Sequence, residues 1–306
     1  MPLVVSCSEA CPAFTLRQCN RRVSMKLSIS ARIAESFLSK EEATMSLSEL
    51  ADLAVAAGYD AVCMRASQIG IHSSPEEIKA ARQLLDARGL SVSMVTGDFD
   101  IVYNNDNGPQ CLRNITPHLD LAESLGAPLI RTCIKTSADI PFAQQAADEA
   151  AERGIRLAHQ CHAESLFETP DQIVDTLQKI DRPNFGLIFE AANLDECGQQ
   201  YGPDIIARFA PWIFNVYLQN QKLSENGEIT LQTWCRGPVS FDIIQIHETG
   251  GINFDVIFAG LNSIGYNGMV TVHQSGSENG REQSISAATQ TAQYLQTRGG
   301  PRADAG

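Results

Sequence analysis

The sequence predicts an α/β fold, a closed (β/α)8 TIM barrel, from three observations. Short apolar runs alternate with amphipathic helical stretches from Met25 onward, which is typical of parallel strands joined by helices. Eight strand–helix units fit into residues 25–290, the usual size of such a barrel. The first strand is not followed by a GxGxxG loop, which a dinucleotide-binding doubly wound sheet would carry. An open doubly wound sheet is therefore only the rival fold.

The expected strands are short and recur along the chain. They cover residues 26–31, 60–66, 90–96, 129–135, 155–162, 185–190, 213–220 and 268–274. The longest gap precedes the last strand and leaves an insertion at 221–250. Long loops in compact domains are often functional, so this insertion is expected to lie near a site.

Helix signals fill the gaps between the strands. Helices are expected over 48–57, 75–87, 140–153 and 170–179. Ser46 or Ser48 can cap the first helix, which stops at Gly58 because glycine favours helix ends. Ser74 and Pro75 open the second helix, as a capping serine before a proline commonly does.

The two ends of the chain differ from the region between them. Residues 1–24 carry three of the nine cysteines and read as an N-terminal extension, expected to be disordered. Residues 25–290 form the expected barrel domain, and 291–306 read as a disordered tail. The chain is thus expected to have a single folded domain.

Composition excludes several classes of protein. The 306 residues are 43% hydrophobic, enough for a large core, and carry a net charge of −13. That charge disfavours nucleic-acid binding and anionic membrane surfaces, and no apolar run is long enough for a membrane helix. The cysteines form no CxxC pair, so reduced thiols and a cytoplasmic location are expected.

Polar side chains gather where strands five to eight of the expected barrel end. Alternation along a strand lets one face present a common set: Gln160, His162, Glu190, Tyr217, Gln219 and His273. Catalytic groups of TIM barrels sit at these strand ends. Carboxylate and imidazole groups can bind a divalent metal, and amides and a phenol can hold a polyhydroxylated ligand. Each residue could equally be structural, with Glu190 paired to a barrel cation and the histidines in the core.

Three cations lie on the other side of the expected barrel. Arg65 ends strand two, and Arg131 and Lys135 share a face on strand four. They could bind a phosphate, a carboxylate or an enolate oxygen. They could equally neutralise Glu190 or another barrel carboxylate, and the sequence leaves these two interpretations open.

At these residues the chain resembles the xylose isomerase-like TIM-barrel superfamily of sugar and sugar-phosphate isomerases and epimerases. The resemblance spans about 25–290 and rests on SELADLAVAAGYDAVCMR, LAHQCH, FGLIFEAANL, NVYLQN and NSIGYNGMVTVHQ. It implies a divalent metal held by acids from strands five, six and eight and a histidine from strand seven. It also implies that glutamates of strands five and eight move protons beside the sugar carbonyl.

Several of the implied positions carry different chemistry in this chain. Gln160 stands where the strand-five glutamate is usual, Tyr217 where the histidine is expected, and His273 where the strand-eight glutamate is expected. Glu190 replaces an aspartate conservatively, and His162 fits the pattern. The two-glutamate relay is therefore absent. A metal set of His162, Glu190 and His273, holding Mn, Co, Mg or Zn, stays compatible with the sequence.

We expect an enzyme that acts on a small-molecule carbohydrate, a sugar or oxidised sugar, as an isomerase, epimerase or lyase. His273 would be the general base, because imidazole titrates near neutral pH. Glu190 would hold a metal or orient the ligand. Arg65, Arg131 or Lys135 would stabilise enolate charge, while Gln160, Tyr217 and Gln219 would bind the substrate.

Two other classes of function compete with this expectation. A non-catalytic carbohydrate-binding or regulatory barrel would have lost the proton relay, as Gln160 and Tyr217 suggest. A zinc-dependent DNA-repair endonuclease shares the fold but needs many metal ligands and a basic surface, which six histidines and a charge of −13 disfavour. A homo-oligomer is compatible with the sequence.

Overall fold

Eight parallel strands close into a barrel in the computed structural model, which describes residues 25–35, 39–276, 281–298 and 300. The strands are β1 (Lys26–Ser30), β2 (Ala61–Arg65), β3 (Ser91–Thr96), β4 (Leu129–Arg131), β5 (Arg156–Gln160), β6 (Phe185–Glu190), β7 (Ile213–Leu218) and β11 (Met269–Val272). Their order around the barrel is β1-β11-β7-β6-β5-β4-β3-β2. The predicted (β/α)8 barrel is confirmed, and the rival open sheet is wrong because β1 pairs with both β2 and β11.

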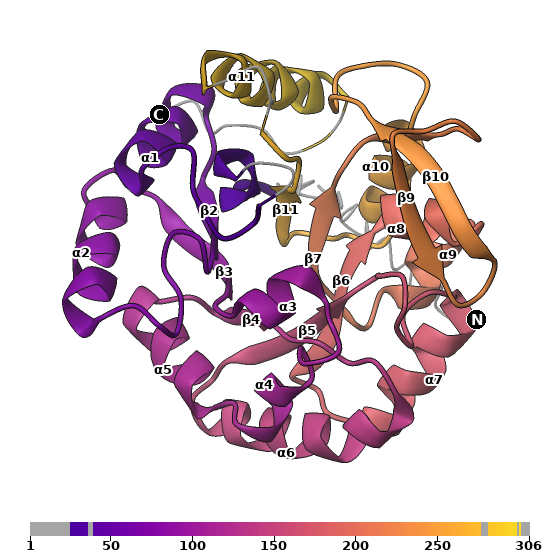
Figure 1. Cartoon of the computed structure of the whole chain (residues 1–306), viewed down its shortest axis with the longest axis horizontal. Helices are drawn as coiled ribbons and strands as arrows, with labels where there is room; N and C mark the ends of the chain where they lie inside the picture. The colour runs from indigo at the N-terminus through magenta and orange to yellow at the C-terminus, as the bar shows by residue number, and fades with distance from the viewer. Residues whose placement is uncertain (1–24, 36–38, 277–280, 299, 301–306) are drawn as a thin grey trace, which may run out of the picture.

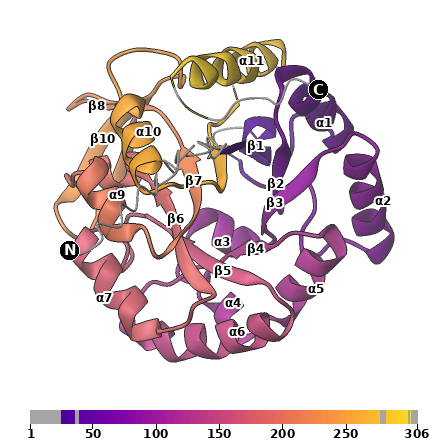
Figure 2. The same cartoon turned by 180° about the vertical axis from the view of Figure 1, so that it is seen from behind.

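Helices surround the strands, and most of them lie on the outside of the barrel (Figure 1). They are α1 (Leu47–Ala57), α2 (Pro75–Asp86), α3 (Phe99–Tyr103), α4 (Gln110–Arg113), α5 (Thr116–Leu125), α6 (Ile140–Glu152), α7 (Pro170–Ile180), α8 (Ala191–Glu196), α9 (Pro203–Phe209), α10 (Phe254–Ser263) and α11 (Arg281–Thr297), with 3-10 turns η1 (Ala31–Ala34) and η2 (Ser137–Asp139). The short α3 follows β3 and lies in front of the strands in Figure 1 and behind them in Figure 2. Figure 1 therefore looks onto the C-terminal ends of the strands.

Local capping explains where the first two long helices begin. The Ser46 hydroxyl accepts the N–H of Glu49, whose carboxylate accepts the N–H of Ser46. Ser74 and Glu77 repeat this reciprocal pair at α2. Two orphan N–H groups of each helix are thereby satisfied. At the other end of α1, Gly58 adopts a φ of 80°, which is strained for residues with a side chain.

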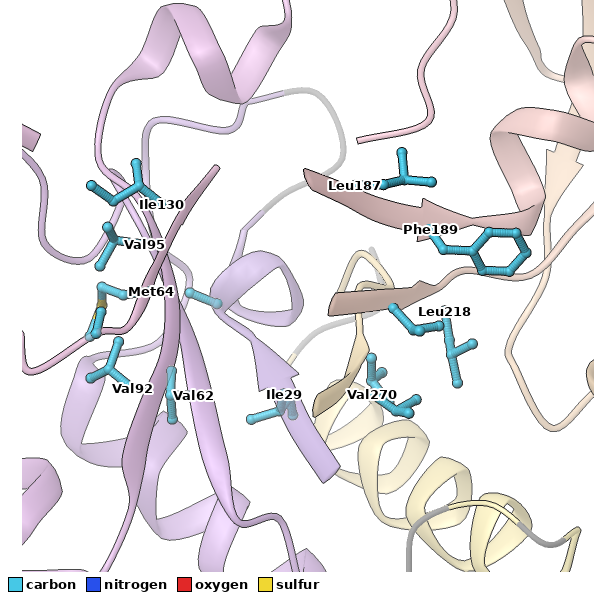
Figure 3. Packing of buried hydrophobic residues seen from close by; sticks show 14 of the residues in the cluster. Ile29, Val62, Met64, Val92, Val95, Ile130, Leu187, Phe189, Leu218 and Val270 are labelled. Atoms are coloured by element: carbon cyan, nitrogen blue, oxygen red, sulfur yellow. The ribbon is translucent and has the colours of Figure 1, made fainter. Parts of the chain in front are cut away.

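Two apolar layers stabilise the barrel, one on each side of the strands. The outer layer joins the strands to the helices and includes Ile29, Val62, Val92 and Val270, which come from four different strands (Figure 3). The inner layer is a separate cluster inside the barrel: Cys63, Met94, Leu129, Ala158, Ile188 and Tyr217. Alternation of side chains along each strand produces this division, and the inner layer fills the barrel as in other folds of this kind.

The predicted insertion at 221–250 forms a small sheet of its own. Its antiparallel strands are β8 (Gln221–Leu223), β9 (Ile229–Thr233) and β10 (Gly237–Ile243), in the order β8-β10-β9. Figure 1 shows β9 and β10 at the rim of the barrel, beside α8 and α9. The insertion is thus an ordered hairpin sheet rather than a loop without secondary structure.

The ends of the described chain modify one predicted boundary. Residues 1–24 and 301–306, for which disorder is predicted, lie outside the described residues. The last helix, α11, continues to Thr297, so residues 291–297 belong to it and the predicted boundary at 290 is too early. None of the helices in the described part of the chain has the length and apolar character that a membrane crossing needs.

Candidate functional site

The last residues of five consecutive strands form a polar layer above the apolar interior of the barrel. Each lies two positions beyond a residue of the inner cluster and therefore points the same way. We call this set the mouth layer: Arg65, Thr96, Arg131, Gln160 and Glu190. The layer lies at the C-terminal ends of the strands, where TIM barrels carry their active sites.

Every member of the mouth layer has a buried polar atom without a hydrogen-bond partner among the described residues. These atoms are Arg65 Nη1, Thr96 Oγ1, Arg131 Nε, Gln160 Oε1 and Glu190 Oε1. They account for five of the twelve such side-chain atoms in the described part of the chain. Buried polar groups are normally paired, so this concentration in one layer indicates a site built for a ligand.

Glu190 is the carboxylate of the mouth layer. Its side chain is buried, and its Oε2 accepts hydrogen bonds from the amides of Gln160 and of Asn193, the latter at 2.6 Å. Burial raises the pKa of Glu190 from its ordinary 4.5 to about 7, although Gln160 and Arg131 act in the opposite direction. A carboxyl group with this pKa can both accept and donate a proton near neutral pH.

Arg65 is held by an ion pair that the sequence analysis missed. Its Nε and Nη2 donate to the two carboxylate oxygens of Glu35 at 2.7 and 3.0 Å. Ser67 and Arg32 donate to the same carboxylate at 2.7 and 3.3 Å. Arg65 therefore belongs to a buried network, and most of its charge is compensated by Glu35.

Arg131 has no such partner. Its side chain is only 2% exposed, and it makes no ion pair or hydrogen bond with the described residues. Burial lowers the pKa of Arg131, while Tyr217 acts to raise it. An arginine is never neutral in a folded protein, so Arg131 is a buried positive charge without an ion pair among the described residues, and the nearby Glu190 acts to raise its pKa.

Two histidines and a lysine border the mouth layer. The Nδ1 atoms of His273 and His162 lie 3.1 Å from Ser30 Oγ and 2.9 Å from the carbonyl of Ala163. Burial, and the charge of Arg131, hold the pKa of both histidines well below 6.5. Both rings are therefore neutral at pH 7. Burial and neighbouring arginines lower the pKa of Lys40 to about 7.

Three other predicted substrate-binding residues lie below or beside the mouth layer. Tyr217 belongs to the inner cluster, where its hydroxyl lies 3.4 Å from Cys63 Sγ and its ring stacks on His273 at 3.9 Å. Gln219 donates to the side chain of Gln221 at 3.2 Å. Lys135 donates from Nζ to the carbonyl of Asn104 at 3.0 Å. Lys135 thus binds the backbone of the loop after α3 and does not neutralise Glu190.

The donor set does not fit the divalent metal that the resemblance implies. Within the described residues, the group of three metal-ligating side chains whose atoms lie within 4.8 Å of one another is Glu168, Cys197 and Cys235. The predicted set of His162, Glu190 and His273 is not brought together in this way. One oxygen of Glu190 is occupied by two amide donors, and the unpaired guanidinium of Arg131 would repel a cation.

Four residues of the site were not predicted from the sequence. Thr96 follows from strand alternation alone, because it lies two positions after Met94. Asn193 lies three positions after Glu190 and one turn along α8, a spacing that brings side chains together. Glu35 directly follows the 3-10 turn η1 and Lys40 precedes α1, and no periodicity placed their side chains at the barrel mouth.

Comparisons with known proteins agree with this architecture. A model of the xylose isomerase-like TIM barrel family matches residues 51–297. A search of curated proteins by sequence found no match. Several solved structures share the fold at low identity.

One of these structures is the probable 3-DHS dehydratase AsbF from Bacillus anthracis, with a TM-score of 0.68 and 15% identity over 89% of this chain and 98% of that one. A D-allulose 3-epimerase from Methylomonas sp. has a TM-score of 0.62 and 16% identity, covering 90% and 98%. A xylose isomerase-like TIM barrel protein from Mycobacterium smegmatis, solved in complex with magnesium, has a TM-score of 0.64 and 17% identity over 90% of this chain and 96% of that one. The family match spans most of the chain, and the barrel and its order of strands agree with it: the chain belongs to the xylose isomerase-like TIM barrel family.

Proposed function

We propose that the barrel mouth binds a sugar or an oxidised sugar and moves a proton on the carbon next to its carbonyl, with Glu190 as the proton carrier. One observation carries this proposal: a buried carboxylate whose Oε2 is held by two amides while its Oε1 has no partner. Relatives of the same fold are named as a D-allulose 3-epimerase and a probable 3-DHS dehydratase. Both kinds of reaction break a C–H bond.

The two amides give Glu190 a fixed direction. Gln160 and Asn193 come from β5 and from α8, and both donate to the same oxygen. Proton transfer requires the acid or base to be positioned before the reaction. The free oxygen of Glu190 is the atom that would take the proton from carbon.

We propose a role for His273 that differs from the predicted one of general base. Its ring is neutral at pH 7, because burial and the charge of Arg65 hold its pKa well below 6.5. A base of such low proton affinity is weaker than Glu190 near neutral pH. His273, stacked on Tyr217 and bonded to Ser30, would instead orient a ligand hydroxyl.

The proposed reaction uses no metal at Glu190. A relative of this fold was solved in complex with magnesium, and such a metal is absent from the proposal because the donors around Glu190 do not suit it. We therefore expect proton exchange to persist after the protein is dialysed against a chelator. Full loss of exchange on chelation, with recovery on adding Mn²⁺ or Mg²⁺, would contradict this step.

Deuterium incorporation tests the proposal directly. The protein is incubated in heavy water with a panel of aldoses, ketoses and oxidised sugars, and the proton next to the carbonyl is followed by NMR. We expect exchange with at least one ligand, and a loss of about 10²–10⁴-fold in Glu190→Gln, the usual contribution of a positioned acid–base group. Glu164→Gln, an exposed change on the loop after β5, is the control and retains the full rate.

A non-catalytic carbohydrate-binding barrel is the second candidate. The observation that favours it is that the mouth layer holds a single carboxylate, Glu190, whereas the resemblance implies two acids that share the proton relay. Such a protein would show ligand-induced thermal stabilisation without any exchange of ligand protons. Exchange that depends on Glu190 would exclude this candidate.

A further inference from the structure

We propose that the ligand of the barrel mouth carries a negatively charged oxygen group, a carboxylate or a phosphate, and that Arg131 binds it. This inference shares the site of the proposed function and rests on it for the location of the ligand. It names the class of that ligand, an anionic carbohydrate. It also assigns to Arg131 a binding role that Arg65 and Lys135 do not have.

The contrast between Arg131 and Arg65 is the first support. Arg65 ends β2 and Arg131 ends β4, and both side chains are almost fully buried. Arg65 forms a two-point ion pair with Glu35, whereas Arg131 makes no ion pair or hydrogen bond with the described residues. An unpaired buried charge is strongly destabilising. Because the fold retains this buried charge at the end of a strand, the group that pairs with it would come from a bound ligand.

The local field is the second support. The charge of Arg131 lowers the pKa of Lys40, of His162 and of His273. Arg32 and Arg65 act in the same direction on His273. The positive potential at the barrel mouth is thus felt by several groups on different strands and loops. It is a local property, because the chain as a whole carries a net charge of −13.

The alternatives leave Arg131 without an ion pair. A neutral sugar would offer Arg131 hydroxyl groups but no opposite charge, and a metal cation would add to the repulsion. A carboxylate or a phosphate matches the planar fork of a guanidinium in both charge and geometry. The free oxygen of Gln160 would then accept a hydrogen bond from a hydroxyl group of the same ligand, and the free oxygen of Glu190 would face the carbon next to its carbonyl.

The position of Arg131 also fits the chemistry at Glu190. Strand β4 pairs with β5, and β5 pairs with β6, so Arg131, Gln160 and Glu190 end three neighbouring strands. A ligand anchored through its anionic group on Arg131 would extend across Gln160 toward Glu190. The anchor would fix which carbon faces the carboxylate, as remote binding groups do in enzymes.

Binding measurements with matched pairs of ligands test the inference. D-glucuronate is compared with D-glucose and D-ribose 5-phosphate with D-ribose, by calorimetry and by the shift in melting temperature. We expect the anionic member of at least one pair to bind about 30-fold or more tightly, the usual scale for a buried charge pair. Preference in the first pair alone identifies a carboxylate, and in the second alone a phosphate. Equal binding within both pairs overturns the inference.

Variants of Arg131 connect this preference to one side chain. Arg131→Gln should lose the preference for the anionic ligand, and Arg131→Lys should retain part of it, because lysine keeps the charge without the fork. Arg156→Gln is the matched control: it removes the same charge from β5 near its N-terminal end, where the guanidinium lies over Phe214. A preference that survives Arg131→Gln would overturn the assignment.

The melting temperature of the free protein gives a second readout. Removing an unpaired buried charge should stabilise the fold, so we expect Arg131→Gln to melt at a higher temperature than the wild type. A lower melting temperature would mean that Arg131 is a structural residue and would overturn its role. These results are separable from catalysis: anion preference without proton exchange removes the proposed reaction alone, and exchange without anion preference removes this inference alone.

Discussion

Two buried glutamates, Glu168 and Glu190, have opposite surroundings. Both are about 1% exposed. Glu168 accepts three backbone N–H groups at 2.7 Å, from Glu164 and Trp234 on one oxygen and from Cys235 on the other. Glu190 accepts two side-chain amides on one oxygen and nothing on the other.

The difference is between a carboxylate that stabilises the fold through both oxygens and one that keeps an oxygen available to a ligand. Backbone donors are fixed by the fold, and those around Glu168 connect the loop after β5 to the turn between β9 and β10. The free oxygen of Glu190 contributes nothing to the fold and remains available to a ligand. Burial alone therefore does not distinguish Glu168 from Glu190, whereas the number of partners on each oxygen does.

The largest effect on stability is expected at Glu168. In Glu168→Gln an amide replaces one of the carboxylate oxygens, and its N–H would face a backbone N–H. We expect the free energy of unfolding to fall by about 2–3 kcal/mol, measured by chemical denaturation. Amide hydrogen exchange should show the loss concentrated in β9 and β10.

The exposed neighbour Glu164 supplies the control for this change. Its backbone N–H bonds Glu168 whatever its side chain is, so Glu164→Gln should change stability by less than about 0.5 kcal/mol. A stable, fully protected hairpin in Glu168→Gln would show that the three hydrogen bonds contribute little to stability. Glu168 would then have no structural role to contrast with Glu190.

The opposite sign is expected at Glu190. The carboxylate is buried with one oxygen unsatisfied, so the neutral amide of Glu190→Gln should raise the free energy of unfolding at pH 8 by about 1–3 kcal/mol. Thermal and chemical denaturation at pH 8 measure this gain, which should accompany the loss of proton exchange. A clear loss of stability would mean that Glu190 supports the fold as Glu168 does.

Much of this comparison was accessible from the sequence. The alternation of strands and helices predicted the barrel, and alternation within strands placed Gln160 and Glu190 on one face, where the structure shows their hydrogen bond. These features depend on local periodicity. The pairing of Arg65 with Glu35 depends instead on the 3-10 turn η1 after β1, which no period in the sequence predicted, so the sequence left Arg65, Arg131 and Lys135 as equal candidates.

The contacts of Glu168 could not be predicted from the sequence either. This residue lies in a loop before α7, and its donors include two residues more than sixty positions away. Neither a motif nor a period in the sequence connects these segments. The insertion at 221–250 was predicted to be near a site, but the residue that anchors it could be identified only from the three-dimensional arrangement.

A smaller effect is expected when the pH is varied. The pKa of Glu190 is about 7 in the folded protein against an ordinary 4.5, so the folded state binds this proton more tightly than the unfolded chain. The free energy of unfolding should therefore decrease as the pH rises from about 4.5 to about 7, by about 1 kcal/mol per pH unit, and then level off.

The difference between wild type and Glu190→Gln isolates this contribution. Burial, and to a smaller extent the charge of Glu190, raise the pKa of Glu196 to about 8; the contribution from burial, the larger cause, is common to both proteins. We expect the two stability curves to coincide below about pH 4.5 and to separate above it. Parallel curves throughout would show that Glu190 has an ordinary pKa in the folded protein.

The smallest effect is expected at Tyr217, just below the mouth layer. Tyr217→Phe keeps the ring stacked on His273 and removes only the hydroxyl that lies 3.4 Å from Cys63 Sγ. A weak hydrogen bond to a thiol is lost, so the free energy of unfolding should fall by less than about 1 kcal/mol. Because the hydroxyl points into the inner cluster, ligand affinity in calorimetry should remain within about twofold of the wild type. A drop of tenfold or more, which corresponds to about 1.4 kcal/mol, would place the phenol in contact with the ligand, as the sequence predicted, and would extend the site one layer deeper than the ends of the strands.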